Sequence, residues 1–254
     1  MKSSNPVLTR LGEAAAQERA AGHYAPAGYP AAPPIVRPMT VDDVVVRTVA
    51  LLALTGVAGA LTWALVPDSL LGVAWIGGAM VGLVLGLVIT FARVTNPFVI
   101  SAYAIVEGVF VGAVSKFYET AFEGIVLQAV LGTFGLFFIM AMLFKARVIR
   151  ATPRFVKGVL AALVGVFALI LMNFVLSLFH INTGLRDGSP LAIGFSIVII
   201  IVASLTFILD FAQVEEAVRY GLPQRYAWNC AFGILVGLIW LYLEILRLIS
   251  YFRD

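Results

Sequence analysis

The sequence predicts an all-α membrane protein with seven transmembrane helices. Of its 254 residues, 61% are hydrophobic and only 12% are charged, whereas soluble domains carry about 25% charged residues. The mean hydropathy is +1.01. The apolar runs are continuous rather than alternating, which favours helices over a closed β-barrel as the way to satisfy backbone polar groups in lipid. This composition excludes a soluble globular domain.

The amino-terminal segment differs from the rest of the chain. It has no long apolar run and is rich in Ala, Pro and Gly, most clearly at residues 24–34. We therefore expect residues 1–40 to form a disordered cytoplasmic tail without a cleaved signal peptide. Residues 41–254 are expected to form one seven-span transmembrane domain.

Seven apolar runs are long enough to cross a bilayer, whose core of roughly 30 Å requires roughly 20 apolar residues per helix. Helix breakers such as Pro67, Pro153 and Gly221 separate these runs. The third and seventh runs are the least clean, because Glu107 interrupts the third and Glu244 with Arg247 the seventh. The expected spans are about 45–66, 70–92, 97–117, 122–144, 156–180, 190–213 and 227–250.

The distribution of basic residues predicts the orientation. Of the 17 Lys and Arg residues, all but Lys116, Arg186, Arg247 and Arg253 fall on the same side of the predicted spans as the amino-terminal tail. Because basic residues are enriched in cytoplasmic loops, we expect the amino terminus in the cytoplasm and the carboxy terminus on the opposite side. The basic loop at residues 145–157 is either an ordinary topogenic loop or a site for anionic lipid headgroups.

Glycines recur at helical spacing within three of the spans. A glycine at every fourth position leaves a bare groove along one face of a helix, where a neighbouring backbone can approach closely. This pattern predicts close helix packing rather than chemistry. The glycines are Gly78, Gly82 and Gly86 in the second span, Gly108 and Gly112 in the third, and Gly233 and Gly237 in the seventh.

Four ionisable side chains lie within the predicted spans: Glu107, Asp210, Glu244 and Arg247. Each costs at least about 2.5 kcal/mol near the bilayer centre, so each needs a partner, water or a function. Asp210 shares its helix face with small and polar residues, and this face should point inward. Glu107 is either a carboxylate on an ion path or a carboxyl satisfied by a neighbouring helix.

Arg93 stands at the inner end of the second span, at much the same depth in the membrane as Asp210. An ion pair between Arg93 and Asp210 is therefore our first structural hypothesis. The alternative is that Asp210 simply reaches the inner interface.

Three motifs resemble the Bax inhibitor-1 family, most closely its bacterial branch, over about residues 40–250. They are Ile208-Leu-Asp-Phe-Ala-Gln213, then Asn96-Pro97 followed by Tyr103-Ala-Ile-Val-Glu-Gly108, and Trp240-Leu-Tyr-Leu-Glu-Ile-Leu-Arg-Leu248. The resemblance implies six helices around a central seventh. It also implies either a pH-sensitive calcium leak channel or a protein that binds and restrains a membrane-embedded AAA protease.

In the leak channels of that family, two facing aspartates share a proton and, with an arginine, latch the pore. Two carboxylates in a poorly hydrated site do not both ionise cheaply, so such a pair titrates as a unit. The resemblance makes Asp210 the first aspartate and Arg93 the arginine.

The second aspartate of the family has two possible equivalents. Matching the motif at residues 241–244 makes Glu244 the partner of Asp210. Matching the helix starts instead places Val236 or Gly237 there, which breaks the aspartate pair and leaves Glu244 beside Arg247. Glu244 is 18 residues past Tyr226, roughly 27 Å of helix, and this distance favours the second register.

Two functions remain in competition. The first is a proton-regulated cation leak, with Asp210 as sensor, Glu107 and Glu244 along the path, and calcium ions or protons as the permeant species. The second is a regulator that binds a membrane protease or another membrane partner through the tail or the basic loop. Both place the chain as a multi-pass protein in a bacterial inner membrane, in contact with lipids.

Enzymatic functions find no support in the sequence. The chain has two histidines, His23 and His180, and one cysteine, Cys230. There is no metal-ligand cluster, nucleophile motif or phosphate-binding glycine loop, so we expect no catalytic residue and no cofactor. The basic residues lie between spans rather than on one soluble face, so we expect no nucleic-acid partner.

Overall fold

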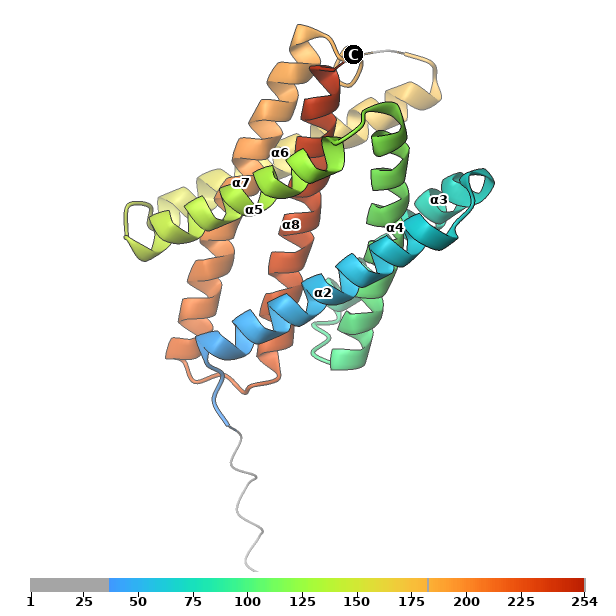
Figure 1. Cartoon of the computed structure of the whole chain (residues 1–254). Coiled ribbons are helices and arrows are strands. Elements are labelled where there is room, and N and C mark those ends of the chain that lie inside the picture. The colour runs from blue at the N-terminus through green and yellow to red at the C-terminus, as the bar shows by residue number, and fades with distance from the viewer. Residues whose placement is uncertain (1–36, 182, 254) are drawn as a thin grey trace, which may run out of the picture. The chain divides into compact units, whose positions relative to one another are not determined.

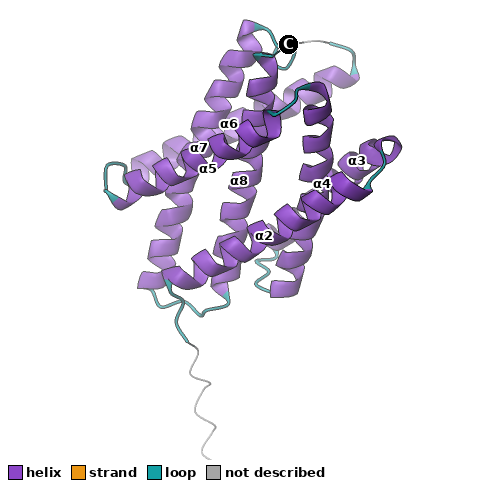
Figure 2. Cartoon of the chain, in the orientation of Figure 1, coloured by secondary structure: helices purple, strands orange, loops and turns teal. Residues whose placement is uncertain are grey.

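The computed structural model describes residues 37–181 and 183–253, so the predicted tail lies almost wholly outside the described residues. Residues from Pro38 onward form one compact unit. Seven of its helices are long and apolar enough to cross a membrane, and the described part of the chain contains no strand (Figure 2). The predicted all-α, seven-span fold is confirmed.

The helices coincide with the seven predicted spans to within a few residues at each end. The sixth of these seven helices extends past its apolar run into a charged segment before Gly221. The elements are α2 (Val41–Leu65), η1 (Asp68–Leu70), α3 (Leu71–Phe91), α4 (Pro97–Ala121), α5 (Ile125–Lys145), α6 (Pro153–Leu178), α7 (Pro190–Arg219) and α8 (Tyr226–Tyr251).

Three of the helices begin with the same capping motif. Asn96, Thr152 and Ser189 are N-caps whose side chains accept a hydrogen bond from a backbone N–H of the first turn, and each is followed by a proline. The cap satisfies an orphan donor and the proline presets the helical φ angle, so both residue types favour a helix start. These sequences set where α4, α6 and α7 begin.

Three helices end on a basic residue in the left-handed conformation. Arg93, Arg147 and His180 have φ angles of 50°, 57° and 58°, directly after α3, α5 and α6. In each case the N–H of the next residue bonds back to a carbonyl five residues earlier, which closes the helix end. A positive charge there faces the negative end of the helix dipole, although glycine adopts this conformation at lower cost.

The carboxy-terminal helix α8 lies at the centre of the bundle (Figure 1). In its most apolar stretch 61% of the residues are buried, against 11% in α3 and α6. It packs directly against α2, α4, α5 and α7. The outer two helices do not reach it, because α3 packs on α4 and α6 packs on α7. The central seventh helix is thus observed, but the six others do not form a closed ring around it.

The predicted glycine grooves are confirmed as packing surfaces. A Cβ atom on Gly108 would lie 2.5 Å from the carbonyl oxygen of Thr55, and one on Gly112 would lie 2.5 Å from that of Gly59. The backbones of α2 and α4 therefore touch. On α3, a Cβ on Gly78 would lie 2.9 Å from the Cβ of Phe110 on α4. Close packing of this kind fixes α2, α3 and α4 against one another.

Candidate functional site

Asp210 lies on α7 and faces α8. A Cβ atom placed on Gly233 of α8 would lie 3.7 Å from its Oδ1 atom, and Cys230, one turn earlier on α8, lies within electrostatic range. The ion pairs among the described residues lie elsewhere, and none of them involves Asp210. Asp210 is thus a membrane carboxyl that faces a glycine and a thiol rather than a cation.

The predicted ion pair between Arg93 and Asp210 is wrong. Arg93 is exposed and follows the end of α3, and the backbone of α3 packs on α4 and comes close to neither α7 nor α8. The two residues were expected at a similar depth, but they belong to helices that are not neighbours. Depth read from a sequence does not give lateral position.

Glu244 lies at the other end of the same helix pair. Its side chain is buried, with 2% of its surface exposed, and its Oε2 atom lies 2.7 Å from Nη1 of Arg247. Ser196 of α7 donates a hydrogen bond of 2.6 Å to Oε1. The i, i+3 pair predicted by matching the helix starts is confirmed. Both oxygens of this carboxylate are therefore occupied.

No aspartate pair forms between the two ends of this interface, which we call the α7–α8 seam. From Gly233, opposite Asp210, to Glu244 is 11 residues of α8, about 17 Å along a helix. The predicted partner positions also need correction. Val236 is 38% exposed and points away, and Gly237 faces Phe207. Gly233, one turn earlier, is the residue that faces Asp210.

An apolar barrier separates the two carboxylates. The ring of Phe207 on α7 is fully buried, and a Cβ on Gly237 would lie only 2.9 Å from it. Leu241 on α8 and Ala203 on α7 are also fully buried and belong to the same hydrophobic cluster. The α7–α8 seam is therefore closed between Asp210 and Glu244.

A second arginine lies near the Glu244 end of the seam. Arg186, in the connection between α6 and α7, is close enough to Arg247 and Glu244 to interact electrostatically with both. Burial lowers the pKa of Arg186, and Arg247 adds to this shift while Glu244 opposes it. Two guanidinium groups thus converge on one buried carboxylate. The sequence indicated only that Arg186 lies on the outer side, because a loop residue shows no helical spacing.

Glu107 belongs to a different interface. It is 9% exposed on α4 and faces α3, where a Cβ on Gly82 would lie 2.6 Å from its Oε1 atom. Tyr103, one turn earlier on α4, is its hydrogen-bonding neighbour. The carboxyl therefore fills the glycine groove of α3 rather than lining the α7–α8 seam. Its place between α3 and α4 is the position expected of a carboxyl packed against a neighbouring helix.

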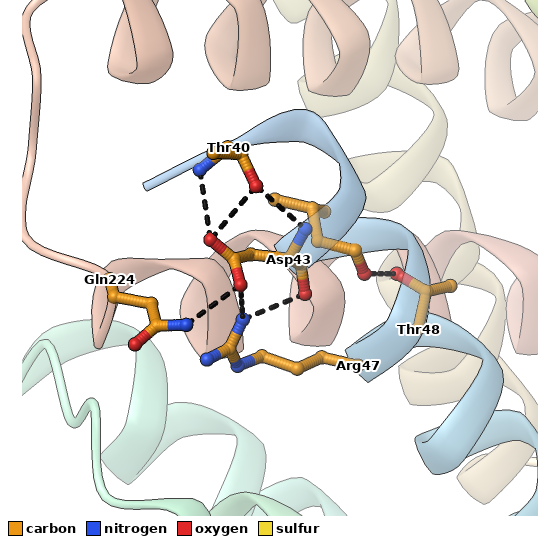
Figure 3. A network of polar contacts seen from close by, with 6 residues as sticks. Thr40, Asp43, Arg47, Thr48 and Gln224 are labelled. Atoms are coloured by element: carbon orange, nitrogen blue, oxygen red, sulfur yellow. Dashed lines mark hydrogen bonds and ion pairs between the residues drawn. The ribbon is translucent and has the colours of Figure 1, made fainter. Parts of the chain in front are cut away.

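A polar network at the opposite end of the bundle from Glu244 ties α2 to the turn between α7 and α8 (Figure 3). Asp43 accepts hydrogen bonds from Thr40 N at 3.0 Å and from Gln224 Nε2 at 2.7 Å. Arg47 lies 3.4 Å from the same carboxylate and stacks over the ring of Trp228, 5.5 Å from its centroid. This network holds the start of α2 against the start of α8.

The backbone reinforces this junction. Met39 N–H donates to the carbonyl of Leu222 at 2.8 Å, and Pro38 pairs with Pro223. The sequence signals the helix start through the Thr40 and Asp43 capping box. It carries no local signal for Gln224, which lies 181 positions away from Asp43.

A mostly apolar crevice is lined by residues of four helices other than α7. It has a volume of about 460 Å³ and lies between α2, α4, α5 and α8. Several of its hydroxyl groups bond within the protein: Thr55 to the carbonyl of Ala104, Thr133 to that of Ala129, and Ser115 to Tyr242. In the described ranges there is no His, Cys, Asp and Glu cluster that could hold a metal.

Comparison with known proteins gives one family. The family model described as Bax inhibitor 1 like matches residues 5–254. Among curated proteins, none matches the chain.

Proposed function

Because the chain belongs to the Bax inhibitor 1 like family, we propose that it conducts cations, calcium among them, along the α7–α8 seam. The chain is a multi-pass membrane protein with seven membrane-spanning helices. One observation carries the proposal. Both Asp210 and Glu244 lie on this seam, at opposite ends of a short apolar barrier.

The proposed path has three parts. At one end Glu244 attracts cations, and Arg247 occupies it in the closed state. In the middle Phe207 and Gly237 form the barrier. At the other end Asp210 has a carboxyl that no cation neutralises among the described residues. A cation that crosses must displace Arg247 from Glu244. It must also push apart the residues that form the barrier.

Asp210 acts as a single proton sensor in this proposal, without the second carboxylate of the family's leak channels. A neutral carboxyl fits an apolar interface, whereas an ionised one requires water, a cation or hydrogen bonds. Loss of the proton therefore favours a hydrated seam. We expect cation flux to rise as the pH rises, because the ionised form attracts both water and cations.

The test is calcium flux into proteoliposomes, measured with an enclosed calcium dye over a range of pH. The wild-type chain should show pH-dependent flux, and Asp210→Asn should show flux that no longer changes with pH. Glu107→Gln is the matched control, because Glu107 lies between α3 and α4, and it should keep the pH dependence. Absence of flux, or wild-type flux that ignores pH, contradicts the proposal.

For the orientation we propose a cytoplasmic amino terminus and an extracytoplasmic carboxy terminus in a bacterial inner membrane. The support is the excess of Lys and Arg on the amino-terminal side. Under this orientation Asp210 lies toward the cytoplasm and Glu244 toward the outside. Protease accessibility of tags fused to each end of the chain in sealed vesicles checks this placement.

A further inference from the structure

A charged pocket lies at the end of the bundle where α5 and α7 finish and α6 begins. It has a volume of about 550 Å³ and is lined by the end of α5, the connection to α6 and the last two turns of α7. Its lining is distinct from that of the α7–α8 seam. Its charged residues are Lys145, Arg147, Arg150, Arg219, Glu215 and Glu216.

The four basic side chains of this pocket form no ion pair with a carboxylate among the described residues. The ion pairs of the described ranges lie at other places in the fold, and none includes a residue of this pocket. Four cations against two carboxylates leave the pocket with a net positive charge of two. Charge complementarity therefore points to an anion.

The pocket also has an apolar side. Phe144, Ile149 and Ala151 line it beside the basic residues, and Tyr220 on the pocket wall is 73% exposed. Exposed apolar and tyrosine side chains next to the end of a span are typical of the interface between headgroups and acyl chains. A ligand with both a charged and an apolar part fits this combination better than a free ion.

Arg147 is held in this pocket at a backbone cost. Its φ angle is 57°, a conformation that costs a non-glycine residue roughly 1 kcal/mol or more. Glycine would close the helix end of α5 equally well. The guanidinium of Arg147 lines the pocket, whereas that of Arg93, at the equivalent end of α3, does not.

We propose that this pocket binds the phosphate headgroup of an anionic phospholipid from the adjacent leaflet. The planar guanidinium groups of Arg147 and Arg150 suit a bidentate contact with phosphate oxygens. Basic pockets between helices on the cytoplasmic side of membrane proteins are recognised sites for such headgroups. The bound lipid would join α5, α6 and α7 at a corner where α6 otherwise packs on α7 alone.

The test uses the full-length chain, purified in detergent and titrated with phosphatidylglycerol or phosphatidylcholine, with bound lipid counted by native mass spectrometry. Phosphatidylglycerol should bind more tightly than phosphatidylcholine. Arg147→Gly should weaken phosphatidylglycerol binding about fivefold, the effect of about 1 kcal/mol for one basic residue, and weaken binding of the zwitterionic phosphatidylcholine less. This variant should fold, because glycine accepts the same φ angle.

Arg93→Gly is the matched control. It removes one arginine from the same kind of helix end, at φ 50°, and Arg93 does not line the pocket. Phosphatidylglycerol binding should be unchanged in this variant. Equal losses in the two variants, or equal affinity for the two lipids, would overturn the proposal. Competition by glycerol phosphate at low millimolar concentration would assign the pocket to a soluble phosphate and would also overturn the lipid assignment.

Discussion

Glu244 and Asp210 lie at the two ends of the α7–α8 seam, and their surroundings differ. Glu244 has an ion pair to Arg247 and a hydrogen bond from Ser196, so its carboxylate is held in one place. Asp210 faces Gly233, which offers no side chain. A carboxylate with both oxygens bonded has a structural role, whereas one without such partners is free to gain and lose a proton. We call the Glu244 end of the seam the fixed end. We call the Asp210 end the responsive end, because its carboxyl can respond to pH.

Arg247→Met tests the fixed end and should have the largest effect on stability. It leaves a buried carboxylate without its cation, which costs about 3 kcal/mol in comparable buried pairs. The melting temperature in detergent, followed by tryptophan fluorescence, should fall clearly. A double variant, Glu244→Gln with Arg247→Met, should recover most of the loss. An unchanged melting temperature in the single variant would show that the ion pair does not hold this end.

Gly233→Asp tests the responsive end by supplying the carboxylate that the seam lacks. The new side chain would begin next to Asp210, because a Cβ there would lie 3.7 Å from Asp210 Oδ1. At high pH two ionised carboxylates repel each other, and at low pH a shared proton removes the repulsion. We therefore expect a loss of about 2 kcal/mol at high pH that diminishes as the pH falls.

The control for this substitution is Gly233→Asn, which has nearly the same shape and no charge. Its melting temperature should show no added dependence on pH relative to the wild-type chain. The same pH profile in the Asp and Asn variants would mean that a carboxylate at position 233 does not interact with Asp210.

Ser196→Ala should have a smaller effect at the fixed end. It removes one hydrogen bond to Glu244 but keeps the ion pair, so the expected loss is about 1 kcal/mol. Ser204→Ala is the control on the same helix, because Ser204 bonds only to the carbonyl of Ile200 one turn earlier. Equal effects of the two substitutions on the melting temperature would argue against a specific role for the Ser196 contact.

The sequence predicted most of the fold because the fold is set by local features. Continuous apolar runs gave the seven spans, and an N-cap followed by a proline marks the first residue of α4, α6 and α7. Counting residues along the last helix also predicted that Glu244 pairs with Arg247. Residues three apart in one helix are neighbours in any packing arrangement.

Contacts between helices were harder to predict, for a physical reason. The hydropathy pattern gives the depth of Arg93 and Asp210 but not which helices are adjacent, and α3 proved to lie outside the central group. The contact between Asp43 and Gln224 joins segments 181 residues apart, and neither segment has a pattern that specifies the other. The glycine facing Asp210 followed only from the way α7 and α8 pack.

The central claim is that cations cross along the α7–α8 seam, and the most direct test is calcium flux through Phe207→Ala at fixed pH. Removing the buried ring shortens the barrier between Asp210 and Glu244, so flux in proteoliposomes should rise above the wild-type rate. Phe110→Ala, which loosens the packing of α4 on Gly78 of α3 instead, should leave the rate unchanged. Flux that is unaffected by Phe207→Ala, or raised equally by both substitutions, would contradict the account.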